Sequence, residues 1–188
     1  MTKKLTPSLR FKEFIGGGNW TEKRLGEVAE FFSGGTPSVK IKEYYKGNIP
    51  FIRSGEIDKE VTQLYINEEA LKNSSAKLVN KGDILYAMYG ATSGQVSISK
   101  IKGAINQAIL VIKLYNNYDK YYTVNYLKMN KERILNKYLQ GGQGNLSGNI
   151  IKKVKFIHPK HIEQEKIGTF FKKLDSLIEK QDQKIENL

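Results

Sequence analysis

Three apolar stretches lie between residues 83 and 113: DILYAMY (83–89), QVSIS (95–99) and AINQAILVIK (104–113). They are rich in aliphatic and aromatic residues, and a segment that contains glycine separates each from the next. Short runs of this composition, bounded by turn residues, are typical of β-strands. We therefore predict three consecutive strands in this part of the chain.

Other short elements are predicted on both sides of these strands. Residues 49–52 and 153–157 also have strand character, and Pro50 restricts the first of them to a sheet edge or a strand start. A brief capped helix is expected over 67–71. With the helices described next, these elements predict a mixed α+β fold of short strands and helices followed by a long C-terminal helix.

Two further helices are predicted from apolar spacing. Apolar residues recur on one side of a helix over 118–139. Leu25, Val28 and Phe32 also have helical spacing, and Thr21 is a candidate N-cap for that helix. Glycine-rich segments at 33–38 and 141–148 are expected to be loops.

The last 28 residues, 161–188, carry a heptad pattern. Its positions alternate by four and three residues: Ile167, Phe171, Leu174, Ile178, Gln181, Ile185 and Leu188. An amphipathic helix that packs on its own domain would explain such a pattern. Against this, a helix of this length spans about 40 Å, more than the preceding body can easily cover. The pattern also runs to Leu188 without a capping glycine, which suggests a partner helix, a truncated chain, or both.

The chain of 188 residues has a net charge of +12. Residues 1–160 carry +13 of this and residues 161–188 carry −1, so the excess positive charge belongs to the body. Such a body favours an anionic partner, with nucleic acid the first candidate and a membrane surface the second. A lysine-rich genome would also explain the excess, since 27 of the 31 basic residues are lysine.

Composition argues against several classes of protein. There is no cysteine, which excludes disulfides and thiolate sites and favours the cytoplasm. His158 and His161 are the two histidines, so we expect no metal site, and we expect no cofactor. The apolar stretches are much shorter than the roughly 20 residues that span a bilayer.

A basic body also suits a nucleic-acid enzyme, which would carry recognisable catalytic motifs. The sequence has no phosphate-binding G-x-x-x-x-G-K-[ST] loop and no glycine-rich cofactor fingerprint. Glu163 and Glu165 precede Lys166, as in some nuclease motifs, but at the start of a helix they are expected to complement the helix dipole. We therefore expect a protein that binds without catalysing a reaction.

Motifs along nearly the whole chain resemble the specificity subunit of type I restriction–modification systems. The matching residues include LRF (9–11), NW (19–20), KRLGEV (23–28), SGGTPS (33–38), IPFIRSGEI (49–57), SSAKL (74–78), KGDILYAMYGATSG (81–94), NQA (106–108), GGQGNLS (141–147) and EQEKI (163–167). The GGQGNLS segment is one residue shorter than the form usual in that family.

This resemblance implies a target recognition domain over residues 1–158 and a conserved spacer helix over 159–188. A full subunit of this type would carry two of each, so the chain resembles a half-subunit. It would bind one half of a bipartite target in double-stranded DNA and dock the modification (methyltransferase) subunits, and through them the restriction subunit. The heptad pattern predicts that two copies pair through the helix.

DNA binding requires lysines that hold phosphates and polar loop side chains that reach base edges. The residues expected to contact DNA are Ser33, Thr36, Arg53, Ser54, Lys77, Lys81, Tyr89, Thr92, Gln143, Asn145, Ser147, Lys152 and Lys153. Arg53 is the main candidate for a guanine contact. A surface ion pair with Glu56 explains Arg53 equally well, Tyr89 could fill the core instead, and Gln143 and Asn145 could simply shape a turn.

A second hypothesis belongs to another class of protein. The chain could be an interaction module, or a competing half-subunit, that binds the modification subunit through its helix without reading DNA.

Overall fold

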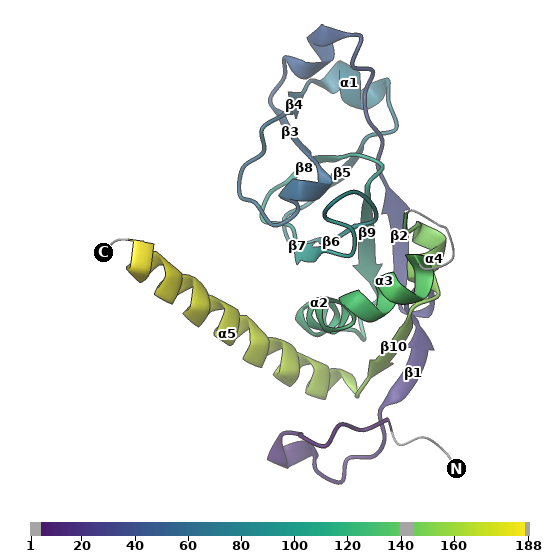
Figure 1. Cartoon of the computed structure of the whole chain (residues 1–188), viewed down its shortest axis with the longest axis vertical. Helices are drawn as coiled ribbons and strands as arrows, with labels where there is room; N and C mark the ends of the chain where they lie inside the picture. Colours follow the sequence, from purple (N-terminus) through teal and green to yellow (C-terminus); the bar gives the residue numbers. More distant parts are fainter. Residues whose placement is uncertain (1–4, 140–144, 187–188) are drawn as a thin grey trace.

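The computed structural model describes residues 5–139 and 145–186, and it shows a mixed α+β body from which one long helix extends (Figure 1). The predicted fold class is thereby confirmed. The strands are β1 (Thr21–Arg24), β2 (Ala29–Ser33), β3 (Ile49–Ile52), β4 (Tyr65–Ile66), β5 (Lys77–Val79), β6 (Ile84–Ala87), β7 (Val96–Ile98), β8 (Gly103–Ile105), β9 (Ile109–Leu114) and β10 (Lys155–His158). The α-helices are α1 (Glu68–Lys72), α2 (Lys120–Met129), α3 (Lys131–Leu139), α4 (Gly148–Lys152) and α5 (His161–Glu186).

The central sheet has the strand order β2-β9-β6-β7, and its neighbouring strands are antiparallel. Successive side chains of a strand point to opposite faces. Ile84 and Tyr86 of β6 therefore join one apolar cluster, whereas Leu85 and Ala87 join another. The two inner strands β6 and β9 are buried on both faces along most of their length, which explains why they are almost continuously apolar.

Different elements cover the two faces. The first cluster adds side chains from the helices and β10, among them Leu127, Ile134, Ile151 and Phe156. The second cluster adds side chains from a second sheet of order β4-β3-β8-β5, in which β3 and β8 are parallel. This second sheet carries α1 on its far side, in the upper part of Figure 1.

Strand β1 pairs with β10 in a separate two-stranded sheet, directly before α5 begins. The first turns of α5 are anchored on the N-terminus of α2. Buried Gln164 accepts a hydrogen bond from the backbone N–H of Asp119 at 3.0 Å. A Cβ atom at Gly168 would lie 2.2 Å from Asp119 Oδ1, so glycine permits this close approach.

From Thr169 to Ile185 the side chains of α5 are exposed (Figure 1). Glu179 in this part of the helix forms an ion pair at 3.9 Å with Lys100, in the turn between β7 and β8. Within the described residues, no helix is both long enough and apolar enough to span a membrane. The division of the chain into domains at residue 158 stays a prediction.

The prediction of a helix from Leu25, Val28 and Phe32 was wrong. Thr21 pairs with His158 in a sheet instead of capping a helix, and Leu25–Glu27 is a 3-10 turn. That turn puts Leu25 and Val28 into the same cluster, whereas Phe32 of β2 packs against the other one. The helical spacing therefore arises from a turn followed by a strand.

Two long predicted elements are interrupted in the structure by asparagine. The expected strand 104–113 is split between β8 and β9, which belong to different sheets, and Asn106 Oδ1 accepts a hydrogen bond from Ala108 N at 3.1 Å in the turn. The expected helix 118–139 breaks between α2 and α3, where the Asn130 side chain bonds the Tyr126 carbonyl at 2.8 Å. Asparagine side chains that bond nearby backbone favour such turns and breaks.

The other predicted elements are present within a few residues. Asn67 caps α1 by accepting from Ala70 N at 2.8 Å, and the first and last predicted strands appear as β3 and β10. Helix α4, capped by Ser147, was not predicted.

Candidate nucleic-acid interface

Several loops that carry predicted DNA contacts meet at Met88, at the end of β6. The Met88 N–H donates to the Ala108 carbonyl at 2.8 Å, and the Met88 carbonyl accepts from Leu146 N at 3.1 Å and from Ser93 Oγ at 3.0 Å. These bonds join loop 88–94, which contains Tyr89 and Thr92, to residues 106–108 and to residues 145–147.

The loop after β2 joins the same group. Thr36 Oγ1 donates to Gln107 Oε1 at 2.7 Å, and Gly35 N donates to the Ile105 carbonyl at 3.2 Å. A Cβ atom at Gly34 would lie 1.9 Å from the Ile105 carbonyl oxygen, so only glycine allows this approach. Lys77 pairs in register with Ile105 and is exposed.

The turn that follows β3 lies beside loop 88–94. A Cβ atom at Gly55 would be 4.0 Å from Thr92 Cγ2. Arg53 and Ser54, both partly exposed, directly precede this glycine. The structure thus gathers Ser33, Thr36, Arg53, Ser54, Lys77, Tyr89, Thr92, Asn145 and Ser147 around adjoining loops; we call this group the loop cluster.

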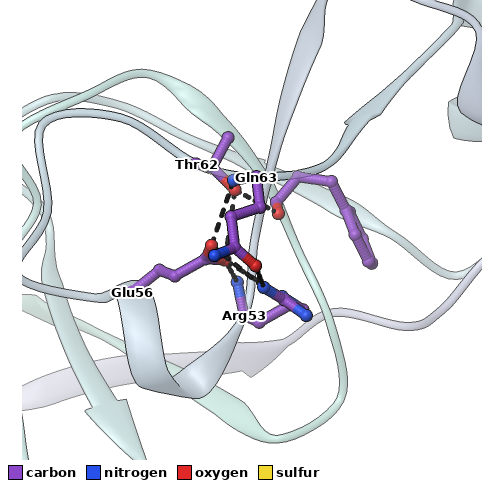
Figure 2. Close-up of polar contacts among 5 residues, drawn as sticks. Arg53, Glu56, Thr62 and Gln63 are labelled. Carbon is purple, nitrogen blue, oxygen red and sulfur yellow. Dashed lines mark hydrogen bonds and ion pairs between the residues drawn. The ribbon is translucent and has the colours of Figure 1, made fainter.

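Arg53 is ion-paired with Glu56, the arrangement that the sequence left open. Arg53 Nε and Nη2 both donate to the Glu56 carboxylate at 3.2 Å, and Arg53 Nη2 also donates to Gln63 Oε1 at 2.6 Å (Figure 2). Thr62 Oγ1 lies 3.1 Å from Glu56 Oε2. Burial alone would raise the pKa of Glu56, but hydrogen bonds from Arg53, Gln63 and Thr62 outweigh it and lower the pKa to about 2.

Other predicted residues combine exposure with a structural role. Tyr89 is half-buried against the core, and burial raises its pKa. Ser147 caps α4 by accepting from Ile150 N at 3.3 Å, while Asn145 before it is exposed. Gln143 lies outside the described residues.

Of the remaining lysines, Lys81 precedes β6 and so lies at the opposite end of that strand from the loop cluster. The Lys152 ammonium lies 5.8 Å from the centre of the Phe31 ring on β2. Lys153 lines a basic hollow that the sequence did not predict. The hollow is also lined by basic residues of β1, β10 and α3, namely Lys23, Arg24, Lys137 and Lys155. Two glutamates, Glu22 and Glu27, lie among them. The pairing of β1 with β10 brings Glu22, Lys23 and Arg24 beside Lys155.

Helix α5 carries an exposed apolar stripe. Phe171 and Leu174 are 39% and 38% exposed, and Ile178 and Ile185 are both 59% exposed. Gln181 is exposed between them. Ile167 is half-buried and packs against the body, so the exposed stripe begins at Phe171. Leu188 lies outside the described residues.

Glu163 has a role beyond the predicted interaction with the helix dipole. It is buried in the first turn of α5, where both carboxylate oxygens accept hydrogen bonds from Arg10 at 2.6 Å. No cluster of acidic residues or histidines suited to a metal ion occurs among residues 5–139 and 145–186.

Comparisons with known proteins identify the family of this chain. Residues 17–187 match the model of the type I restriction modification DNA specificity domain. The specificity subunit of the type I restriction enzyme MjaIX from Methanocaldococcus jannaschii is 31% identical over 182 residues, which cover 90% of this chain and 41% of that protein. The EcoR124I/EcoR124II specificity subunit from Escherichia coli is 28% identical over 178 residues, which cover 90% and 43%.

Solved structures share the fold at low sequence identity. The HsdS subunit from Thermoanaerobacter tengcongensis superimposes with a TM-score of 0.64 at 16% identity, covering 92% of this chain and 40% of that one. The type I restriction–modification S subunit from M. genitalium gives a TM-score of 0.69 at 16% identity, covering 94% and 46%.

The chain spans about two fifths of the length of the curated relatives it matches. The family match itself extends over nearly all of it. The chain therefore belongs to the family of type I restriction modification DNA specificity domains.

Proposed function

We propose that this chain recognises one half of a bipartite DNA target for a type I restriction–modification system. The observation that carries the proposal is the loop cluster, in which polar side chains distant in sequence meet on a body of net charge +13. Base reading requires polar groups on a shared surface, and phosphate binding requires surrounding positive charge. Its family membership supports the same function.

Helix α5 would serve a second purpose, the docking of modification subunits and through them the restriction subunit. Its exposed apolar stripe would also pair two copies of the chain, each reading one half of a symmetric site. Catalysis would reside in the other subunits, and the complex would act in the cytoplasm. The family match and the exposure of the stripe support these assignments.

The test is selection of bound duplexes from a randomised DNA library, with and without a type I modification subunit. One short motif, or its palindrome with a fixed spacer, is the expected result. Thr36→Val removes the hydroxyl that bonds Gln107 and should alter the motif, whereas Thr169→Val on α5 should not. If the unaltered chain enriches no motif under either condition, the proposed function is wrong.

A further inference from the structure

Gln63 extends the Arg53–Glu56 pair toward solvent. Its backbone N–H donates to Glu56 Oε1 at 3.1 Å, and its side-chain Oε1 accepts from Arg53 Nη2 at 2.6 Å (Figure 2). The Arg53 side chain is 42% exposed and that of Glu56 is 12% exposed. The Glu56 carboxylate is thus shielded from solvent, and the side chains of Arg53 and Gln63 that lie over it are more exposed.

The chemistry of the guanidinium fixes the orientation of the Gln63 amide. A guanidinium has hydrogen-bond donors and no acceptor, so the amide must turn its oxygen toward Arg53. The amide nitrogen Nε2, with two N–H groups, is then left over. Across the described part of the chain, neither this Nε2 nor Arg53 Nη1 has a hydrogen-bond partner.

The two free groups, Arg53 Nη1 and Gln63 Nε2, lie next to the hydrogen bond between Arg53 Nη2 and Gln63 Oε1. Arg53 Nη1 shares its carbon with Nη2, and Gln63 Nε2 shares its carbon with Oε1. Resting on the DNA-binding function proposed above, we infer that Arg53 and Gln63 form one donor-only group that reads the O6 and N7 acceptors of guanine, with Gln63 as a specificity-determining residue.

Base chemistry explains the choice of guanine. In the major groove guanine presents two neighbouring acceptors, whereas adenine presents one acceptor and one amino donor. A group made only of donors faces the adenine amino group with a second donor and leaves that bond unmade. Glu56 acts as a positioning residue, since it holds both the Arg53 guanidinium and the Gln63 backbone.

The position in the fold agrees with a role in reading bases. The adjoining turn at Gly55 lies beside Thr92 of the loop cluster. A phosphate group also offers only acceptors, and it would meet the same donors. Sequence dependence separates the two ligands, because phosphates are identical at every base pair.

The test compares library selections for the unaltered chain, Gln63→Ala and Gln63→Glu. The unaltered chain should select guanine at one position, and Gln63→Ala should reduce that preference on the order of 5- to 150-fold at that position alone. Gln63→Glu keeps an acceptor for Arg53 but turns a second acceptor outward. It should shift the same position toward cytosine or adenine, whose amino groups donate.

Asn116→Asp is the control for added negative charge, because Asn116 is exposed just beyond the end of β9 that lies away from the loop cluster. It should leave every base preference unchanged. Arg53→Lys keeps the charge but lacks the planar fork, and it should weaken the same guanine position. Unchanged thermal midpoints would show that the variants are folded.

Two results overturn this inference while leaving the proposed function intact. One is a motif that the Gln63 variants do not change. The other is equal weakening on all sequences with a shallower salt dependence, which identifies a phosphate contact. If the unaltered chain selects no motif, the proposed function fails and the guanine contact fails with it.

Discussion

Arg10 and Glu163 form a two-point ion pair that fastens the N-terminal segment to the first turn of α5. Arg10 Nε and Nη2 each donate to one carboxylate oxygen at 2.6 Å, and the two side chains are 9% and 3% exposed. Because both side chains are shielded from water, removal of either one would leave the charge of the other without a partner. The pair therefore links the start of the chain to the helix that leaves the body.

Arg10→Ala should release the N-terminal segment and lower the thermal midpoint, since Glu163 would remain buried without its partner. Limited digestion with chymotrypsin, whose sites at Phe11 and Phe14 the substitution leaves intact, should then cut within residues 5–20 faster than in the unaltered chain. Lys46→Ala is the control, because it removes a pair with Glu43 whose side chains are 68% and 70% exposed. Equal digestion rates for all three proteins would contradict the role of the Arg10–Glu163 pair.

Gly168→Ala should weaken the packing of α5 on α2. The added Cβ would lie 2.2 Å from Asp119 Oδ1, which caps α2 by accepting from Tyr122 N at 2.7 Å. The shifts that relieve this overlap should lower the free energy of unfolding by about 1–2 kcal/mol, after the better helix propensity of alanine is included. Urea unfolding measures the change, with Thr169→Ala as an exposed control; a Gly168→Ala variant of unchanged or higher stability would refute the close contact.

The sequence predicted the central strands well because their apolar character reflects burial on both faces. It failed between residues 21 and 33, where the pairing of Thr21 with His158 decides the local structure. No window of neighbouring residues contains that information. Asn106 and Asn130 carried a readable signal for the two missed breaks, since both interrupt apolar patterns with a side chain that bonds nearby backbone.

The candidate site was predictable in part for a similar reason. Polar residues flanked by glycine pointed to Thr36, Arg53 and Thr92, and the structure brings their loops together. Gln63 carried no such signal, because its importance comes from the orientation that Arg53 imposes on it. The strand register was also needed to tell which lysines lie near the loop cluster.

Acid should remove a stabilising contribution of Glu56. Its pKa is lowered from 4.5 to about 2 in the folded chain, so the unfolded chain binds more protons between these values. The contribution is therefore complete above pH 4.5 and is lost as the pH falls toward 2, with a size of about 3 kcal/mol.

Urea unfolding at pH 7 and pH 3 tests this sign. Glu56→Gln should be less stable than the unaltered chain at pH 7, and the difference should shrink at pH 3. The exposed Glu43→Gln should match the unaltered chain at both pH values. A difference between Glu56→Gln and the unaltered chain that stays constant or grows in acid would show that the Glu56 carboxylate does not stabilise the fold.

Two lysines at opposite ends of the central sheet offer a test of which end binds DNA. Lys77 lies beside Ile105 in the loop cluster, whereas Lys81 lies at the other end of β6. Lys77→Gln should reduce the slope of log affinity against log salt concentration by about one, since one phosphate contact is lost. Lys81→Gln should leave the slope unchanged; the reverse result would place DNA at the opposite end of the sheet.

The apolar stripe of α5 should join two copies of the chain. Ile178 is 59% exposed, and Leu174 before it and Ile185 after it share its side of the helix. Ile178→Asp would place a charge within the contact and should weaken self-association at least about tenfold, or about 1.4 kcal/mol. Ser176→Asp adds the same charge on the opposite side of α5 and should have little effect.

Sedimentation measures both variants, and library selection gives a second readout. If the dimer reads a palindrome with a fixed spacer, Ile178→Asp should select only the half-site, because the loop cluster lies on the body and is unchanged. An unaltered chain that stays monomeric well above micromolar concentration would contradict the dimer. Loss of the half-site in the Ile178→Asp variant would instead show that base reading depends on the helix.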